Sequence, residues 1–319
     1  MRILHDFRYE RPSSLEEALA LLEEHGAEAR PLAGGTDVVV GMKHRSMLQL
    51  VGEAGTDRSR FPAAGRVPPI DRPGVLISLA DLTDLARITV AEDLVTVGPR
   101  ATMTQIVATQ GMPAALAALT DAAAIMGSPQ IRNRATVGGN LVNARPAADT
   151  AVAAIALGAR ITLASAGGSR TVEADGFITA PGETVRRPDE LVTAMELPFG
   201  PGQGSAYVRQ GTRRQLEIAL VGAASWVEID PGSGDVAAAR ICLGAVGPTP
   251  ICAPGAARSL EGGPPTAERI GRAAEIAEGE ARPIDDYRGS AAYRREVVGV
   301  LVRRTLAAAL ERAGRQAGR

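Results

Sequence analysis

The stretch SPQIRNRATVGGNLVNARPAAD, from Ser128 to Asp149, decides the fold of this chain. Within it, Gly138 and Gly139 stand between Thr136 and Asn140. Because glycine has no Cβ, backbone that carries two glycines can approach a ligand closely and direct successive amides at it. The stretch therefore predicts a loop that binds a phosphate group.

A second loop of this kind lies about 100 residues earlier, in the sequence LAGGTD from Leu32 to Asp37. A single Gly-Gly pair usually indicates only a tight turn. Two pairs, each beside Thr and beside Asn or Asp, favour two loops that hold the two halves of a pyrophosphate. We expect a strand at Arg30 to Ala33 and a helix from Thr36 through Met42, an order that aims amides at an anion.

The sequences PLAGGTDVVVGMKHR and IRNRATVGGNLVNARPAADT resemble the two FAD-binding loops of the flavoprotein (medium) subunits of molybdenum hydroxylases. This family includes xanthine dehydrogenase and carbon monoxide dehydrogenase. The resemblance runs nearly end to end, through ELVTAMELP from Glu190, YVRQGTRRQLEIALVG from Tyr207, LGAVGPTP from Leu243 and DYRGSAAYRREVVGVLVRR from Asp286.

The opening ILHDFRYERPSSLEEAL is similar to the corresponding subunit of 4-hydroxybenzoyl-CoA reductase. That subunit carries an additional 4Fe–4S cluster in a cysteine-bearing insertion after its second glycine loop. Here no cysteine stands between Asn140 and Asp149. We therefore expect that this chain does not bind that cluster.

The resemblance implies an α+β fold in two parts. The first is a two-subdomain FAD-binding domain of the PCMH (vanillyl-alcohol oxidase-like) type, and the second is a three-stranded antiparallel sheet with helices. The implied limits are 1–180 for the first domain, with subdomains at about 1–50 and 75–180 around an insertion at 51–74, then a linker and closing strand at 181–204, and the C-terminal domain at 205–313. The strands of the last sheet are expected at Tyr207 to Gln210, Ala219 to Ile229 and Val236 to Val246. A Rossmann fold would need G-x-G-x-x-G, and neither loop has that spacing.

The resemblance also implies which residues hold FAD, without a covalent bond. The two loops hold its pyrophosphate, Asp149 reaches a ribityl or ribose hydroxyl, and an apolar residue and a cation lie nearby. The implied residues are Pro31, Leu32, Ala33, Gly34, Gly35, Thr36, Asp37, Val38, Thr136, Val137, Gly138, Gly139, Asn140, Asp149, Val192 and Arg209. The alternative for Asp149 is a charge at a helix N-terminus.

Two positions depart from the family pattern. The family cation at position 209 is commonly lysine, and Arg209 keeps the charge without the same geometry. Relatives usually carry a small residue where this chain has Arg145, whose alternatives are a surface charge or a salt link to a phosphate or to Asp149.

In such enzymes a molybdenum-cofactor large subunit oxidises the substrate, and a small subunit with 2Fe–2S clusters relays the electrons. The FAD subunit then passes them to an external acceptor. The resemblance implies that this chain is that FAD subunit, in a heterotrimer that dimerises. No catalytic residue and no metal site are predicted, because His5, His25 and His44 stand apart and no G-x-S-x-G or H-E-x-x-H occurs. Two alternatives stay open: a stand-alone FAD-dependent oxidase, and an assembly subunit without flavin.

Composition narrows the class of partner further. The formal net charge of −1 provides no general attraction to nucleic acid or to an anionic membrane. Cys242 and Cys252 are the only cysteines, and no apolar run reaches the roughly 18 residues of a membrane span. We therefore expect a cytoplasmic protein. Because aromatic residues make up only 3% of the chain, its cores must consist mainly of Ala, Val, Leu and Ile.

Overall fold

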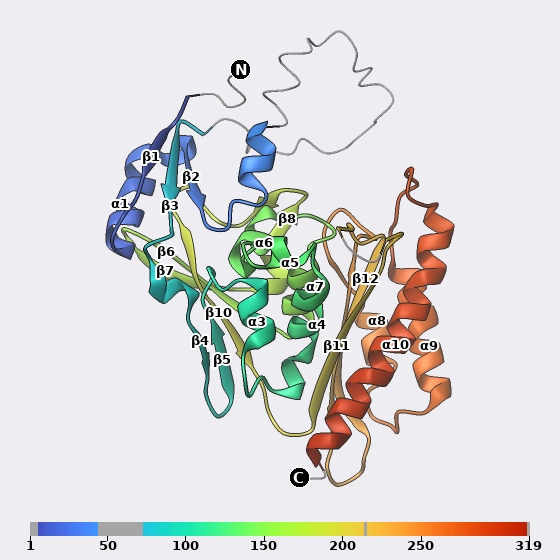
Figure 1. The fold of residues 1–319 in the computed structure, drawn as a ribbon. Helices are drawn as coiled ribbons and strands as arrows, with labels where there is room; N and C mark the ends of the chain where they lie inside the picture. Colours follow the sequence, from blue (N-terminus) through green and yellow to red (C-terminus); the bar gives the residue numbers. More distant parts are fainter. Residues whose placement is uncertain (1–5, 44–72, 214–215, 318–319) are drawn as a thin grey trace.

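The computed structural model describes residues 6–43, 73–213 and 216–317. The predicted insertion at 51–74 lies almost wholly outside these ranges. Figure 1 shows a small sheet with one helix at one end of the molecule, a group of helices in the middle, and a sheet covered by long helices at the other end. No helix in the described ranges is long and apolar enough to cross a membrane.

The first sheet is parallel and has the strand order β1-β3-β2. Its strands are β1 (Arg8–Glu10), β2 (Ala29–Leu32) and β3 (Val75–Ser78), and helix α1 (Leu15–His25) packs against it. The N-cap of α1 is Ser14, whose side chain accepts from the amide of Glu17, while the Glu17 carboxylate accepts from the amide of Ser13. The helix ends at Gly26, which has a φ of 49°. After β2 the chain turns through the first glycine loop into a helix at 38–43.

The second sheet has five antiparallel strands in the order β4-β5-β10-β6-β7. They are β4 (Ile88–Val90), β5 (Leu94–Val97), β6 (Arg160–Ser165), β7 (Gly168–Glu173) and β10 (Leu191–Pro198). The strand β10 lies in the middle of this sheet, so the closing strand expected within 181–204 completes the sheet of the first domain. The domain limits near 180 and 205 themselves stay a prediction.

A layer of short helices lies between the five-stranded sheet and the C-terminal sheet (Figure 1). The helices are α3 (Met103–Ala108), α4 (Ala117–Ile125), α5 (Pro129–Arg132), α6 (Val137–Asn143) and α7 (Asp149–Ala156). Short connecting elements are η1 (Gly26–Glu28), η3 (Thr83–Ala86), η4 (Ala114–Leu116), η5 (Ala174–Gly176), β8 (Ile178–Ala180) and β9 (Glu183–Thr184).

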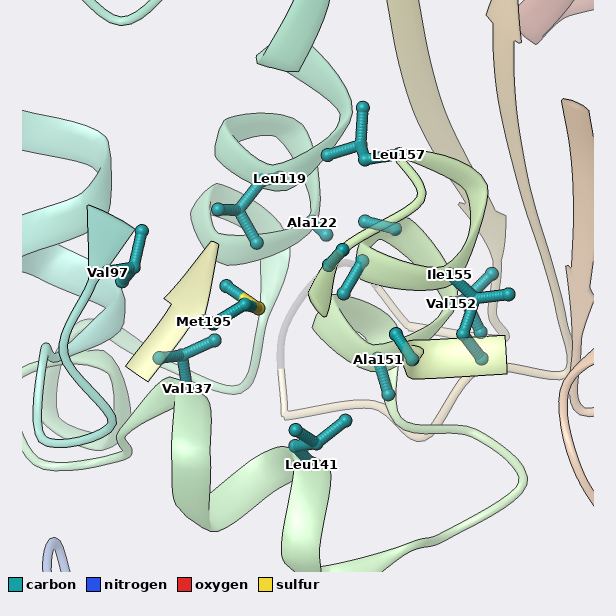
Figure 2. Close-up of a cluster of buried hydrophobic side chains, with 14 of the residues drawn as sticks. Val97, Leu119, Ala122, Val137, Leu141, Ala151, Val152, Ile155, Leu157 and Met195 are labelled. Carbon is teal, nitrogen blue, oxygen red and sulfur yellow. The ribbon is translucent and has the colours of Figure 1, made fainter. Parts of the chain in front are cut away.

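The core between these helices and the sheet is aliphatic, as the composition predicts. In Figure 2 the side chains of Leu119, Val137 and Met195 converge from α4, α6 and β10. All eight residues of α7 are buried. Its alanines allow close approach, because they add little width to the helix, and α7 contacts strands of the C-terminal sheet.

The C-terminal sheet has the order β11-β12-β13-β14 and is antiparallel. Its strands are β11 (Gln203–Gln210), β12 (Val221–Ile229), β13 (Val236–Gly244) and β14 (Ile251–Cys252), and its helices are α8 (Pro254–Arg258), α9 (Ala267–Glu280) and α10 (Ala291–Ala317). The three predicted strands are confirmed. The fourth strand was not predicted, because two residues provide no alternating pattern.

Candidate functional site

A cavity of about 1290 Å³ lies where the first domain meets the C-terminal sheet. Its volume exceeds the roughly 300–1,000 Å³ typical of sites for small ligands and suits a large cofactor. Both predicted glycine loops line it, at 33–38 and 136–140. The C-terminal domain contributes three segments, at 216–218, 245–248 and 282–294.

The two glycine loops lie against each other, although they are far apart in the sequence. A Cβ at Gly34 would lie 1.9 Å from the carbonyl oxygen of Arg134, just before the second loop. A Cβ at Gly138 would lie 2.5 Å from the Cβ of Pro99 and 2.8 Å from its carbonyl oxygen. The first glycine of each pair is therefore required by the packing of backbone against backbone.

The second glycine of each pair has a different environment. A Cβ at Gly35 would meet only two side chains, both at 3.5 Å, and the φ of Gly35 is 77°. A Cβ at Gly139 would meet only the Oγ1 of Thr136, at 2.9 Å, and would otherwise project into open space. The positive φ of Gly35 itself favours glycine, whereas Gly139 is the position where the absence of a side chain leaves room for a ligand.

The amides of the two loops are not equivalent. In the second loop, the amide of Val137 donates to Ala101, that of Gly138 to Pro99 and that of Gly139 to the Oγ1 of Thr136. In the first loop, the amides of Gly35, Thr36 and Asp37 have no acceptor within the described part of the chain. The first loop therefore provides the amides that have no acceptor in the described chain. The second loop provides a helix N-terminus capped by Thr136 and, at Gly139, a surface without a side chain.

Thirteen of the sixteen predicted cofactor residues line the cavity. The three others are Leu32 on β2, Val137 in the core and Arg209 on β11. Those that line it are Pro31, Ala33, Gly34, Gly35, Thr36, Asp37, Val38, Thr136, Gly138, Gly139, Asn140, Asp149 and Val192.

Asp149 is the first residue of α7 and is 4% exposed. Its Oδ1 accepts from the hydroxyl of Tyr207 at 2.6 Å, and its Oδ2 accepts from the Nη1 of Arg209 at 2.8 Å. Burial raises the pKa of Asp149, and the charge of Arg209 opposes that shift. The helix terminus, the predicted cation and the C-terminal sheet are therefore joined at one wall of the cavity.

A second acid, Asp37, follows the free amides of the first loop. Burial raises its pKa, while the charge of Arg145 and hydrogen bonds with Asn143 and Thr36 lower it. Arg145 lines the cavity and acts on Asp37 across the two loops. Asn143 and Arg145 thus connect the second loop electrostatically to the first.

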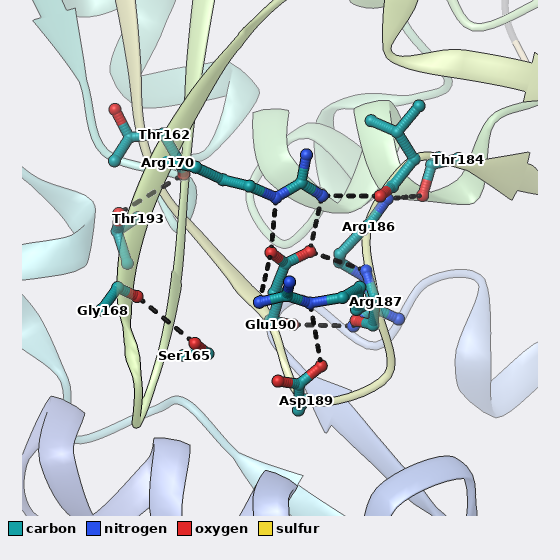
Figure 3. Close-up of polar contacts among 11 residues, drawn as sticks. Thr162, Ser165, Gly168, Arg170, Thr184, Arg186, Arg187, Asp189, Glu190 and Thr193 are labelled. Atoms are coloured by element: carbon teal, nitrogen blue, oxygen red, sulfur yellow. Dashed lines mark hydrogen bonds and ion pairs between the residues drawn. The ribbon is translucent and has the colours of Figure 1, made fainter.

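The strand that carries Val192 is held by an ion pair, shown in Figure 3. Glu190 is 1% exposed, and its two carboxylate oxygens accept from the guanidinium of Arg170 at 2.6 and 2.9 Å. These hydrogen bonds lower the pKa of Glu190. Arg186, which lines the cavity, donates to the carbonyl of Glu190 at 2.7 Å. This network orients the chain as it enters β10 at the cavity.

Within the described residues, seven arginines and five acidic residues line the cavity, so its charge is positive. The sequence singled out only Arg145 and Arg209, of which Arg209 is not in the lining. The arginines that line it are Arg30, Arg100, Arg145, Arg186, Arg282, Arg288 and Arg294. Arginine on a loop or a helix is usually solvated, so only the spatial arrangement distinguishes these from surface charges.

Two family models match the chain. The one described as the FAD binding domain in molybdopterin dehydrogenase matches residues 5–51 and 69–200. The CO dehydrogenase flavoprotein C-terminal domain matches residues 206–309. Together they cover both glycine loops and the three C-terminal segments of the cavity.

The chain is also similar to characterised proteins over nearly its whole length. It is 28% identical over 309 residues to the xanthine dehydrogenase FAD-binding subunit of Escherichia coli O157:H7, covering 96% of this chain and 97% of that subunit. It is 30% identical over 307 residues to the carbon monoxide dehydrogenase medium chain of Afipia carboxidovorans, covering 96% and 98%. A solved structure of carbon monoxide dehydrogenase from Hydrogenophaga pseudoflava superposes with a TM-score of 0.85 at 30% identity, covering 98% and 99%.

Proposed function

This chain belongs to the family of FAD-binding medium subunits of molybdenum hydroxylases, and we propose that it passes electrons through bound FAD to an external acceptor. The electrons come from iron–sulfur clusters of a small subunit, which receives them from a molybdenum-cofactor large subunit. The three subunits form a heterotrimer that dimerises. The observation that carries this proposal is the cavity, in which both glycine loops of the FAD-binding family meet.

The residues of the cavity fit FAD in three respects. The amides of Gly35, Thr36 and Asp37 have no acceptor in the described chain, which suits a pyrophosphate. Gly139 leaves space where a side chain would obstruct close approach. The excess of arginines in the lining favours a ligand with two phosphate charges.

When bound, FAD supplies the electron-transfer chemistry, so the chain needs no nucleophile or metal of its own. The first loop would hold the pyrophosphate, and the second would provide a flat surface at Gly139. Asp149 would accept hydrogen bonds from sugar hydroxyls. Each of its oxygens already accepts one hydrogen bond, from Tyr207 or from Arg209, and each can accept a second, because a carboxylate oxygen has two lone pairs. Val192 at the start of β10 would exclude water from an apolar part of the cofactor.

We place the protein in the cytoplasm, because a chain of 319 residues with only two cysteines does not have the disulfide-rich composition typical of small secreted domains.

The test is anaerobic reduction of the flavin in the purified chain, alone and with its co-purified partner subunits. We expect the chain alone to remain oxidised with small organic substrates, and to be reduced when the iron–sulfur and molybdenum subunits and their substrate are present. Rapid reduction of the isolated chain by an organic substrate would support a stand-alone oxidase instead. A chain that binds no flavin under any condition would support an assembly subunit.

A further inference from the structure

We propose that the C-terminal wall of the cavity is a phosphate-binding subsite, formed by Arg288 and Arg294, which both pair with Asp286, and by Arg282 in the same lining. This inference rests on the proposed function, because it identifies a second anion-binding region in the same cavity. All four residues line that cavity.

Arg294 lies in the first turn of α10 and is 2% exposed. Its Nη1 donates to the carbonyl of Ala245 at 3.1 Å, and its Nη2 lies 2.6 Å from the Oδ1 of Asp286. Its Nε has no acceptor among the described residues. A guanidinium stays charged at all relevant pH values, and a buried donor without an acceptor costs free energy. An anion in the cavity would satisfy this donor.

Arg288 approaches Asp286 from the other side. Its Nε and Nη2 donate to the Oδ2 of Asp286 at 3.1 and 2.8 Å, and its Nη1 has no acceptor in the described chain. Burial raises the pKa of Asp286, but hydrogen bonds from Arg294 and Arg288 outweigh it and bring that pKa to about 2. Two guanidinium groups therefore surround one carboxylate, which leaves one positive charge, and Arg282 adds a second positive charge to the same lining.

Two other acids in the cavity lining do not compensate these charges, because they are already paired elsewhere. Glu217 accepts from Thr212 and Arg213, and Asp149 accepts from Tyr207 and Arg209. The planar donor set of arginine matches two oxygens of a phosphate at once. The geometry thus fits a phosphate group better than a neutral ligand.

The phosphate has two possible sources. It is either a phosphate of FAD that lies at this wall rather than at the first loop, or a phosphate of a second nucleotide that brings or removes electrons at the same cavity. Both present the same chemistry to the arginines. An experiment with separate measurements for FAD and for an added nucleotide distinguishes them.

The variant to test is the double substitution Arg282→Gln and Arg288→Gln in the full chain, since Arg294 is buried and its replacement could impair folding. The matched control is Arg295→Gln, an exposed arginine on α10 outside the cavity lining. FAD retention is measured by absorbance, and ADP binding to the flavin-loaded chain by calorimetry. Loss of charge-assisted hydrogen bonds should weaken binding about tenfold or more.

If ADP binds the loaded wild type and binds the double variant at least about tenfold more weakly, with FAD retention unchanged, the subsite holds a second nucleotide. If FAD retention falls in the double variant and not in the control, the subsite holds a phosphate of FAD. If FAD retention and ADP binding both equal those of the control, the proposal is overturned. If the wild type retains no FAD, the proposed function fails. ADP binding is then compared between the flavin-free wild type, the double variant and the control. Weaker binding in the double variant alone supports the subsite, and equal binding overturns it.

Discussion

Adding a side chain at the two adjacent glycines of the second loop should have different effects: at Gly138 it should lower the stability of the protein, and at Gly139 it should lower its affinity for FAD. Gly138 faces backbone and Gly139 faces the cavity. In Gly138→Ala the new Cβ would lie 2.5 Å from the Cβ of Pro99 and 2.8 Å from its carbonyl oxygen. Relieving such overpacking costs about 1–3 kcal/mol and also strains the hydrogen bond from the Gly138 amide to Pro99, and together these exceed the gain of about 1 kcal/mol from replacing a helical glycine by alanine. We expect a less stable protein whether or not FAD is present.

In Gly139→Val the effects on the fold are small and partly cancel. Replacing a helical glycine by the β-branched valine gains about 0.4 kcal/mol, while displacing the Oγ1 of Thr136, 2.9 Å from the new Cβ, weakens an N-cap worth about 1 kcal/mol. The flavin-free variant should therefore melt within about 4 °C of the flavin-free wild type. FAD affinity should fall at least tenfold, or about 1.4 kcal/mol, because the side chain occupies ligand space.

The assay compares flavin absorbance per protein with thermal unfolding of the flavin-free proteins, for wild type and both variants. Full flavin occupancy in Gly139→Val would refute the assignment of the open position. Wild-type stability in Gly138→Ala would refute the packing argument. A variant that loses both flavin and fold at Gly139 would also contradict this reasoning, since the structure shows no backbone in its way.

Two further predictions concern buried charges. Asp149→Asn should destabilise the protein by about 3–5 kcal/mol, because Arg209 would remain buried without a counter-charge. Tyr207→Phe removes only a hydrogen bond and should cost less than half as much. Urea unfolding measures the stability of both variants, and equal losses of stability would contradict this prediction. The lowered pKa of Glu190 means that its contribution to stability is fully present above its ordinary pKa of 4.5 and is lost as the pH falls through the lower, folded-state pKa. Glu190→Gln should therefore weaken the decline of stability below about pH 4.5, and an unchanged acid transition would argue against the pairing with Arg170.

The parts of the site that the sequence predicts are those written in short, continuous motifs. The two glycine loops are recognisable because a turn that excludes Cβ restricts adjacent residues. The different roles within each pair are not recognisable, since they depend on Pro99 and on Arg134, which reach the glycines only through the fold. The same holds for the amides of the second loop, whose acceptors at Pro99 and Ala101 precede that loop by more than 30 residues.

The predicted capping box of the first helix shows the limit of local patterns. From the sequence, the spacing of Ser13 and Glu16 predicts a capping box at the start of the first helix. This prediction is wrong by one residue, since Ser14 caps the helix and Glu17 reaches back to Ser13. Adjacent serines and glutamates make both registers chemically possible. Packing of the apolar face of the helix, through Leu19 and Leu22, selects the register.

The position of the cavity between two domains makes its shape depend on contacts that the sequence separates widely. Asp149 of the first domain binds Arg209 of the second, and the amide of Ala245 donates to the carbonyl of Pro146 at 2.7 Å. The Nη1 of Arg294 donates a hydrogen bond to the carbonyl of the same Ala245. Because each of these contacts borders the cavity, a ligand bound there would stabilise the two domains together. The C-terminal domain is therefore a wall of the cavity in which we propose that FAD binds, as well as a neighbour of the domain that carries the glycine loops.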